Sequence, residues 1–274
     1  MKVYWLEQTD EDLPPGNAWL SPTEQDQLNA LRFAKRRADW RLGRWTAKHA
    51  LAACLQLSAD LHDLAKIEVR PSASGAPEIF LGDRRAPATI SLSHRAGRAV
   101  CAVVPFCSAL GCDLELVEPH SDAFIADYFA TEEQALIAQA APEDRPWLVT
   151  LLWSAKESAL KALRAGLRLD TRRVIAIPGD ALAHRNKAGT DFVQKDPAQK
   201  LDLAAGQPEA HRAWHPLRVR HVHGQTFLGW WQMSDSLVRT LVAAPPPPRP
   251  IFLSAPHSTA KGPALAGSDQ SQAA

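Results

Sequence analysis

The sequence has 274 residues, of which 46% are hydrophobic and 22% are charged, and its formal net charge is +1. This composition is typical of a soluble globular protein and excludes an acidic disordered chain or a basic nucleic-acid-binding arm. At roughly 100–200 residues per domain, the length predicts one large domain or two small ones packed together.

Membrane and export signals are not found in the sequence. The longest apolar stretch, Ala99 to Cys112, is interrupted by Pro105 and is shorter than the roughly 18 residues that a membrane span needs. Glu7 interrupts the N-terminal segment before the apolar core of a secretory signal can form. The four cysteines show neither a C-x-x-C pair nor a histidine cluster, which favours buried thiols over a zinc site or a disulfide framework. We therefore expect a cytoplasmic protein.

The first part of the chain, residues 1–117, reads as a strand, then helices, then strands. Lys2 to Leu6 predicts a strand, and Ser21 with Glu24 forms a capping box at the start of a helix. Apolar residues recur at helical spacing up to Leu57, which predicts one broken helix or two consecutive ones. The further predicted strands are Ile67 to Arg70, Glu78 to Leu81, Thr89 to Ser93, Ala99 to Pro105 and Ala109 to Leu116.

The second part, residues 118–243, repeats this order. Helical periodicity predicts helices over Asp122 to Ala140 and Pro146 to Ala165, and residues 179–210 read as a surface excursion. Strands are predicted at Arg173 to Ile177, Trp214 to Val222, Thr226 to Trp231 and Ser236 to Val242. The repeated order predicts an α+β fold of two similar α/β halves packed as a pseudo-twofold single-chain structure. Residues 244–274 begin with a proline run and predict a disordered proline-rich tail.

A basic stretch lies in the first predicted helical region. From Arg32 to Lys48 the chain holds seven cations and one anion, and Arg37, Arg41, Arg44 and Lys48 fall on one helical face. One interpretation is a solvated basic face. The other is a phosphate-binding surface, because guanidinium groups match the geometry of phosphate oxygens.

Two further motifs carry carboxylates. Gly111-Cys112-Asp113-Leu114-Glu115 places Asp113 and Glu115 on the same face of a predicted strand, where converging carboxylates need a cation such as Mg²⁺. In the later helix, Trp153, Glu157, Lys161 and Arg164 share one face, which by itself indicates only an amphipathic helix. Ser91-Leu92-Ser93-His94 ends a strand, and a lone histidine there is more often a loop residue than a functional one.

The order of these motifs is more specific than any one of them. The Arg-x-x-Trp-x-x-Gly-Arg helix at 37–44 is followed by Ser-Leu-Ser-His at 91–94, Gly-Cys-Asp-Leu-Glu at 111–115 and Trp-Ser-Ala-Lys-Glu-Ser-Ala-Leu-Lys at 153–161. This order resembles the 4′-phosphopantetheinyl transferase superfamily, in its larger, surfactin-synthetase-activating (Sfp-like) type. The resemblance implies a monomer of two similar α/β halves that moves phosphopantetheine from coenzyme A to a serine of an apo acyl or peptidyl carrier protein, leaving adenosine 3′,5′-bisphosphate. It implies neither a nucleic-acid partner nor a membrane.

The resemblance also implies roles for individual residues. Asp113, Glu115 and Glu157 would hold Mg²⁺ on the pyrophosphate, and Glu157 or a metal-bound water would take the serine proton. Glu157 and Lys161 would be catalytic. Coenzyme A would be bound by Arg36, Arg37, Arg44, Gly75, Pro77, Ser93, His94, Asp113, Lys156 and Lys161. Phe129 and Glu133 would border the carrier protein site.

One departure and two alternatives remain open at this level. The family often has Gly-Lys-Pro where this chain has Gly75-Ala76-Pro77, so a cation is missing there, for which Arg70 or the basic helix would compensate. A coenzyme A-dependent acyltransferase would also need a phosphate cradle, but its usual glycine-rich turn is not met around Gly43. A nucleic-acid-binding module would use the basic helix, but the overall charge near zero argues against a broad phosphate surface.

Overall fold

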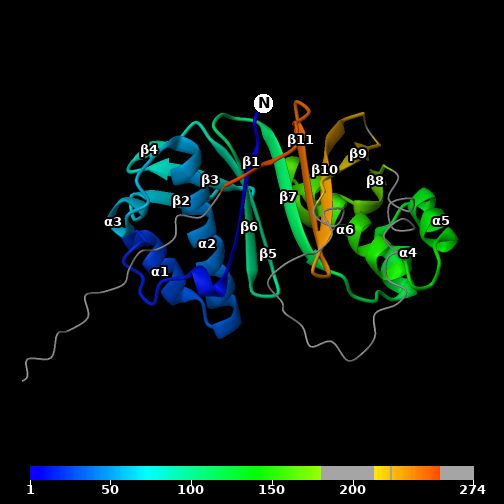
Figure 1. Ribbon diagram of the computed structural model, residues 1–274, viewed down its shortest axis with the longest axis horizontal. Coiled ribbons are helices and arrows are strands. Elements are labelled where there is room, and N and C mark those ends of the chain that lie inside the picture. Colours follow the sequence, from blue (N-terminus) through cyan, green and yellow to red (C-terminus); the bar gives the residue numbers. More distant parts are fainter. Residues whose placement is uncertain (180–212, 223, 254–274) are drawn as a thin grey trace, which may run out of the picture.

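The computed structural model describes residues 1–179, 213–222 and 224–253. These residues form three β-sheets and six α-helices, and Figure 1 shows them as two units side by side, one around α2 and one around α6. The mixed α+β class expected from the sequence is confirmed. Apart from residue 179, the surface excursion predicted over 179–210 lies outside the described residues.

The first unit contains a four-stranded sheet, a three-stranded sheet and the long helix α2. The larger sheet has the order β12-β1-β6-β5, and the smaller has the order β2-β3-β4. The elements are β1 (Tyr4–Thr9), α1 (Pro22–Ala30), α2 (Ala34–Leu55), α3 (Leu61–Leu64), β2 (Ile67–Pro71), β3 (Pro77–Leu81), β4 (Arg84–Arg85), β5 (Thr89–Arg95), β6 (Arg98–Val104) and β12 (Ile251–Phe252). Trp45, Ala47 and Leu51 of α2 pack in one buried cluster with Leu6 of β1 and Val103 of β6, so the apolar face of the helix covers the larger sheet.

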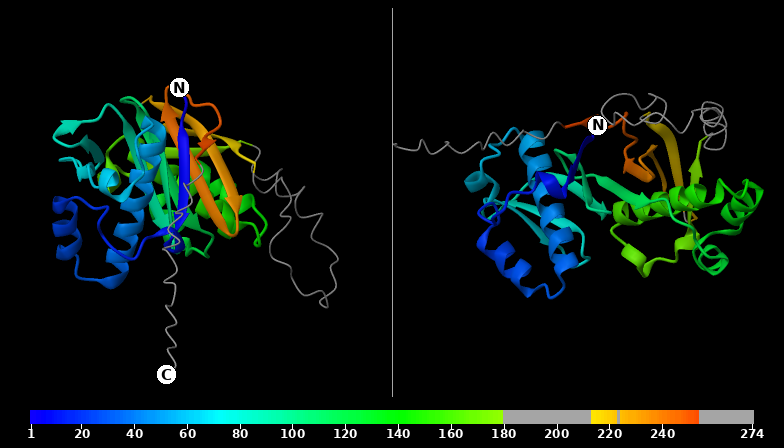
Figure 2. Two further views of the ribbon diagram at one scale, coloured as in Figure 1. Left: turned by 60° about the vertical axis from the view of Figure 1, so that its left-hand side comes forward. Right: turned by 60° about the horizontal axis from the view of Figure 1, so that its bottom comes forward.

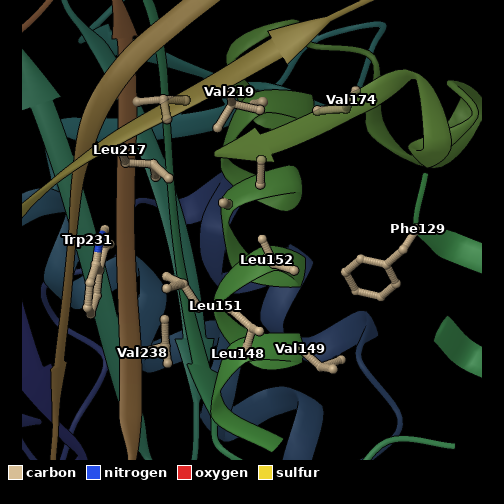
Figure 3. Packing of buried hydrophobic residues seen from close by; sticks show 14 of the residues in the cluster. Phe129, Leu148, Val149, Leu151, Leu152, Val174, Leu217, Val219, Trp231 and Val238 are labelled. Atoms are coloured by element: carbon tan, nitrogen blue, oxygen red, sulfur yellow. The ribbon is translucent and has the colours of Figure 1, made fainter. Parts of the chain in front are cut away.

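The second unit is a five-stranded antiparallel sheet with α6 packed on one face. Its strand order is β7-β11-β10-β9-β8. The elements are β7 (Ala109–Leu116), α4 (Asp122–Tyr128), α5 (Thr131–Gln139), α6 (Arg145–Ala162), β8 (Val174–Pro178), β9 (His215–His221), β10 (Thr226–Ser234) and β11 (Leu237–Ala244). Figure 3 shows Leu148 and Leu151 of α6 lying toward Trp231 and Val238 of the sheet, and all four belong to one buried cluster.

Strand β7 joins the two units. It pairs along its whole length with β11 in the five-stranded sheet, and Ser91 of β5 accepts a hydrogen bond from the Cys112 N–H at 2.9 Å. Helix α6 approaches this strand so closely that a Cβ at Gly111 would lie 1.8 Å from the carbonyl oxygen of Ser158. The domain boundary predicted at residue 117 therefore falls just after a strand whose hydrogen-bonded partner belongs to the later part of the chain.

Helix boundaries follow local chemistry. The two consecutive helices expected before Leu57 are confirmed as α1 and α2, and the Ser21 and Glu24 capping box closes the start of α1 with bonds of 3.2 Å. The single helix expected over Asp122 to Ala140 is wrong, because extended backbone at Phe129 and Ala130 separates α4 from α5. The Ala130 N–H donates to Glu133 at 2.9 Å, so a new helix begins there.

The expectation of a disordered tail from residue 244 is wrong for residues 245–253. Ile251 and Phe252 form β12, which pairs in parallel with β1, and the Ile251 N–H donates to the Val3 carbonyl at 2.9 Å. The indole of Trp230 donates to the Pro247 carbonyl at 3.1 Å, and Pro247 is buried. Prolines lack an amide donor, but their carbonyls accept hydrogen bonds. The segment crosses from β11 to β1 along the surface (Figure 2).

Each unit contains a fully buried lysine paired with a glutamate. Lys48 of α2 lies 2.5 Å from Glu24, and its ammonium donates to the carbonyls of Trp19 and Leu64. Lys156 of α6 lies 2.6 Å from Glu133, and its ammonium donates to the carbonyls of Thr171 and Val174. Glu24 accepts from the Val69 N–H of β2, and Glu133 accepts from the Ala176 N–H of β8, so each pair ties its long helix to the strand that follows it.

In the part of the chain that the structure describes, none of the helices combines the length and the apolar character that crossing a bilayer requires.

Candidate functional site

A cleft of about 370 Å³ lies where the two units meet. Its walls come from α2, from β2 and the turn after it, from β5, from the start of β7, and from α6 and the residues that follow it. The lining residues are Arg44, Arg70, Pro71, Ser74, Gly75, Ala76, Pro77, Thr89, Ile90, Ser91, Leu92, Leu110, Leu160, Lys161, Arg164 and Gly166.

Four cations line this cleft: Arg44 from α2, Arg70 from β2, Lys161 from α6 and Arg164 from the residues after α6. Arg44 lies over the ring of Trp40 at 4.8 Å, and its Nε is 3.8 Å from Glu24. Burial lowers the pKa of the Arg44 guanidinium although Glu24 opposes that shift. An unliganded cleft that holds partly desolvated guanidinium groups gains electrostatic stabilisation when an anion enters it.

Arg70 is fixed by two neighbours of its own strand pair. Its Nε donates to Glu68 at 2.6 Å, and its guanidinium lies 4.2 Å from the ring centre of Phe80 on β3. Arg70 thus presents a fixed cation in the wall that contains Ala76, at the side of the cleft where the sequence lacks a lysine. Arg164 follows α6 in a left-handed backbone conformation, with φ of 54°, and lies on the opposite wall.

The turn between β2 and β3 closes one end of the cleft. The Ser72 N–H donates to the Ala76 carbonyl at 2.8 Å, and Gly75 has a φ of +86°, which side-chain-bearing residues rarely adopt. Arg168, in the short 3₁₀ helix Gly166–Arg168, donates to the Ser74 carbonyl at 3.3 Å. This contact joins the turn of the first unit to the end of α6 in the second.

At the other end of the cleft the cations meet carboxylates. Asp113 of β7 is buried, and its Oδ1 accepts from the ammonium of Lys161 at 2.6 Å and from the hydroxyl of Ser93 at 2.8 Å. Its Oδ2 is buried and has no hydrogen-bond partner. Burial lowers the pKa of Lys161 but Asp113 outweighs it, so the net pKa of the ammonium is raised and Lys161 stays charged.

Glu115 and Glu157 share the electrostatic field of Asp113. The pKa of Glu115 is raised to about 7, with burial as the largest cause and the charge of Asp113 as the second. The charge of Glu157 acts in the same direction, whereas Arg95 and Lys161 oppose the shift. Burial and then Asp113 also raise the pKa of Glu157, against the opposing effect of Lys161. These shifts mean that the three carboxylates lie close enough to repel one another.

The three carboxylates are the kind of ligand that a divalent cation prefers, but their side chains do not surround a single point. Among the described residues, no group of three histidine, cysteine, aspartate or glutamate side chains is arranged tightly enough to hold a metal ion. The buried, unpartnered Oδ2 of Asp113 and the raised pKa of Glu115 are nevertheless both relieved by a hard cation such as Mg²⁺, which prefers carboxylate oxygens. The residues present therefore fit such an ion.

Several residues expected to bind coenzyme A lie outside the cleft. Arg37 donates to the Leu28 and Leu31 carbonyls at 2.8 and 3.3 Å, so its guanidinium caps the end of α1. Arg36 is exposed on α2, and His94 is exposed with its Nδ1 4.0 Å from Asp39. Lys156 is buried on Glu133, on a different face of α6 from Glu157 and Lys161.

The residues expected to border a carrier protein are not at the surface. Phe129 is 0% exposed and Glu133 is 2% exposed, since the first belongs to the apolar core and the second holds Lys156. Their place in the sequence, next to helix boundaries rich in acids and aromatics, does not distinguish such interior residues from a docking surface. Only the contact with Lys156, which lies in another helix, shows that Glu133 is an interior residue.

The structure also brings in residues that motif reasoning did not place in the site. Arg164 lines the cleft, and its spacing from Glu157 and Lys161 on one helical face was the signal for it. Arg95, which directly follows the Ser-Leu-Ser-His motif, lies 3.5 Å from Glu115. No pattern in the sequence pointed to Arg95.

A second, smaller cleft of about 200 Å³ opens beside Glu115. It is lined by Arg95, Glu115, Leu116, Glu118, His120, Phe124, Thr150 and Trp153. Two elements, α6 and β7, run from the large cleft to this one. Along α6 the order is Lys161, Glu157, Trp153, and along β7 it is Leu110, Asp113, Glu115. The carboxylates therefore lie between a cationic cleft and a cleft of mixed aromatic and ionic lining.

A cationic cleft next to carboxylates suited to a divalent cation has the chemistry to accept a phosphate-bearing ligand. Residues 109–204 match the model of the 4′-phosphopantetheinyl transferase superfamily, and this part of the chain contains a domain of that superfamily. Asp113, Glu115, Glu157 and Lys161 lie within the match, whereas α2 and the turn at Gly75 precede it.

Two further comparisons add no second assignment to a family. No curated protein sequence matches the chain. Among solved structures, the chain is similar to the crystal structure of Helicobacter pylori holo-[acyl-carrier-protein] synthase (AcpS) in complex with coenzyme A. The identity is 20%, the similarity covers 37% of this chain and 97% of that chain, and the TM-score is 0.29.

Proposed function

We propose that this protein is a 4′-phosphopantetheinyl transferase of the larger, surfactin-synthetase-activating type. It transfers phosphopantetheine from coenzyme A to a serine of an apo acyl or peptidyl carrier protein. The superfamily match over residues 109–204 supports the class of reaction. The observation that carries the proposal is the position of Lys161, whose ammonium binds Asp113 while its side chain lines the cationic cleft. An anionic ligand that fills this cleft would therefore have one end next to the carboxylates.

Coenzyme A is the ligand that we infer for the large cleft. Its phosphates are matched by Arg44 of α2, Arg70 of β2 and Arg164, which follows α6. The turn at Gly75 and Pro77 offers backbone and a flat apolar surface against which an adenine can lie. Arg70 supplies the cation that Ala76 does not.

Asp113, Glu115 and Glu157 would hold Mg²⁺. When bound, that ion supplies positive charge to the pyrophosphate oxygens and so offsets the negative charge of the three acids. The fit is supported by the unpartnered Oδ2 of Asp113 and by the raised pKa values of the other two carboxyls, which result from burial first and from repulsion by Asp113 second. Lys161 holds the remaining oxygen of Asp113 and turns the carboxylate in one orientation.

The reaction is a phosphoryl transfer, in which placement and charge matter more than covalent catalysis. The serine oxygen of the carrier forms a bond to the phosphorus next to pantetheine. The bond from that phosphorus to the bridging oxygen breaks, and adenosine 3′,5′-bisphosphate leaves. The serine proton goes to the carboxylate of Glu157, which acts as the general base. The ammonium of Lys161 compensates the charge on the leaving phosphate.

The proposal includes a relation between the two halves of the chain. The Glu24–Lys48 and Glu133–Lys156 pairs are the same arrangement of a helix start, a long helix and a following strand. This repetition supports a pseudo-twofold duplication, although the sheets of the two units differ in strand number and order.

Intact-mass analysis of an apo carrier protein tests the function. Incubation with coenzyme A and Mg²⁺ should add the mass of one phosphopantetheine, and the increment should be absent with a chelator or with Asp113→Asn. An acyl-sized increment from acyl-coenzyme A would instead indicate an acyltransferase. Several folded apo carriers that all stay unmodified at high enzyme concentration would overturn the proposal.

A further inference from the structure

Arg95, the last residue of β5, bridges two glutamates at the mouth of the second cleft. Its Nε lies 3.5 Å from Glu115, and its terminal nitrogen donates to Glu118 at 2.7 Å. Its side chain is 39% exposed and that of Glu118 is 46% exposed, so both can move without opening the core. The shorter contact is the one to the glutamate that lies outside the carboxylate group.

We propose that Arg95 is a positioning residue that holds Glu115 while no divalent cation is bound and moves onto Glu118 alone when a divalent cation takes Glu115. The inference rests on the proposed function only in that Asp113, Glu115 and Glu157 receive a divalent cation. Arg95 is then an internal counter-ion of Glu115 that competes with the metal.

The distribution of charge around the carboxylates supports this role. Asp113 has Lys161 at 2.6 Å on one oxygen, and its other oxygen is buried and has no hydrogen-bond partner, so the lysine leaves one carboxylate oxygen of Asp113 for a cation. Glu115, in contrast, already has a guanidinium beside it. A divalent cation that bound Glu115 would repel Arg95 at short range, and a nearby carboxylate offers the guanidinium another place.

The surroundings leave room for this movement. Arg95, Glu115 and Glu118 all line the second cleft of about 200 Å³, together with the side chains of His120 and Thr150. The hairpin after Arg95 turns at Ala96 and Gly97, which have φ values of 51° and 70°. The guanidinium can therefore swing toward Glu118 within the cleft while β5 keeps its pairing with β6.

The test measures the affinity of the full chain for Mn²⁺ without coenzyme A, by the electron paramagnetic resonance signal of free Mn²⁺. Arg95→Gln removes the competitor and should tighten Mn²⁺ binding about fivefold. Fivefold corresponds to about 1 kcal/mol, the upper end for an exposed ion pair. Glu118→Gln removes the alternative partner and should weaken Mn²⁺ binding by a similar factor.

The double variant separates this exchange from a general effect of charge. In the Arg95→Gln background, Glu118→Gln should leave the affinity unchanged, because there is no guanidinium left to move. Equal effects of Glu118→Gln in both backgrounds would show a simple electrostatic field and would overturn the inference. Arg85→Gln is the matched control, since Arg85 is 55% exposed, lies 2.9 Å from Glu78 in the three-stranded sheet and lines neither cleft. It should not change Mn²⁺ affinity.

The remaining outcomes distinguish this inference from the proposed function. Unchanged or weaker Mn²⁺ binding by Arg95→Gln, in a protein that still modifies apo carriers, contradicts the exchange alone. Wild-type protein that binds no Mn²⁺, or that binds it equally well with Asp113→Asn, has no site for Arg95 to compete for, and this also overturns the inference. Melting curves of all variants establish that they are folded.

Discussion

Arg37 and Arg44 lie on the same helix, seven residues apart, but their guanidinium groups bind different parts of the molecule. Arg37 donates to two carbonyls at the end of α1 and thereby satisfies backbone acceptors that a helix end leaves free. Arg44 lies in the wall of the cleft, between the ring of Trp40 and the carboxylate of Glu24. The two arginines should therefore respond differently to the same substitution.

We expect Arg44→Gln to weaken coenzyme A binding about tenfold to a hundredfold. One hydrogen bond to a charged group contributes roughly 1.5–3 kcal/mol, and a neutral amide replaces it poorly. Isothermal titration without Mg²⁺ measures the change. Arg37→Gln is the control and should lower the melting temperature while leaving the affinity for coenzyme A unchanged. Equal losses of affinity in both variants would contradict the assignment of Arg44 to the cleft.

His49 gives a second prediction at this scale. It is almost fully buried beside Trp45, with ring centres 4.1 Å apart, and both of its ring nitrogens lack a hydrogen-bond partner. Burial lowers its pKa to about 4, against a weak opposing effect of Asp12. The folded protein therefore binds its proton less readily than the unfolded chain does, and protonation favours unfolding.

The free energy of unfolding should consequently fall as the pH drops from about 6.5 to about 4, by up to roughly 3 kcal/mol from this group. Above pH 6.5 His49 is neutral in both states and contributes no dependence. Urea unfolding of the wild type and of His49→Phe at several pH values measures this, and the difference between the two curves should become constant above pH 6.5. A difference that does not change with pH would contradict the depressed pKa.

At the scale of elements, periodicity and capping chemistry predicted α1, α2, α6 and most strands. These features depend on neighbours within one or two turns, which the sequence displays directly. The break between α4 and α5 was missed. Glu133 caps the start of α5 and is held in that position by its pairing with Lys156 of α6, which the local sequence does not show. Pairing of β7 with β11 joins residues more than a hundred positions apart, and no local signal reports it.

The candidate site was predictable in part for the same reason. Spacing put Asp113 and Glu115 on one strand face and Glu157 and Lys161 on one helix face. Only the resemblance of the ordered motifs to the transferase superfamily implied that the strand and the helix share one site. Lys156 is adjacent to Glu157 in sequence but about 100° away around the helix, and that angle sends it to the interior. Whether such a lysine meets a ligand or a buried acid depends on α5, which the motif does not contain.

We expect Lys156→Met to destabilise the protein by about 3–5 kcal/mol, because Glu133 is then left buried without its counter-ion. The matching pair Lys156→Met with Glu133→Leu should recover much of this loss, since removing both charges avoids an unpaired one. Urea unfolding measures the free energies. Preserved stability with lost coenzyme A affinity in Lys156→Met would instead make this lysine a ligand of the cleft.

At the scale of the whole molecule, contacts far apart in sequence hold the two units together. Arg239 of β11 binds both carboxylate oxygens of Glu7 on β1, at 2.6 and 2.7 Å, and Arg98 lies 3.2 Å from the same carboxylate. Arg168 joins the end of α6 to the turn that contains Ser74. The walls of the large cleft belong to both units, so its shape depends on these connections.

The segment after β11 is a further connection, and its removal should be measurable. Truncation after Ala244 deletes β12 and three hydrogen bonds, from Ile251 to Val3, from Leu253 to Trp5 and from Trp230 to Pro247. At about 0.5–1.5 kcal/mol each, their loss should cost roughly 2–4 kcal/mol, or on the order of 5–15 °C in melting temperature. Truncation after Leu253 is the control, and equal melting temperatures for the two truncated proteins would contradict a stabilising role for this segment.

The parallel pairing of β1 with β12 also has a consequence for biosynthesis. Strand β1 leaves the ribosome first, and its neighbour β12 is made only when residues 251 and 252 are added. Until then one edge of β1 keeps unpaired amides and carbonyls, which in a crowded cell can pair with other nascent chains. We expect the first unit to stay open to a chaperone or a protease on a ribosome stalled before residue 251, and to become resistant only once residues 251 and 252 have left the ribosome.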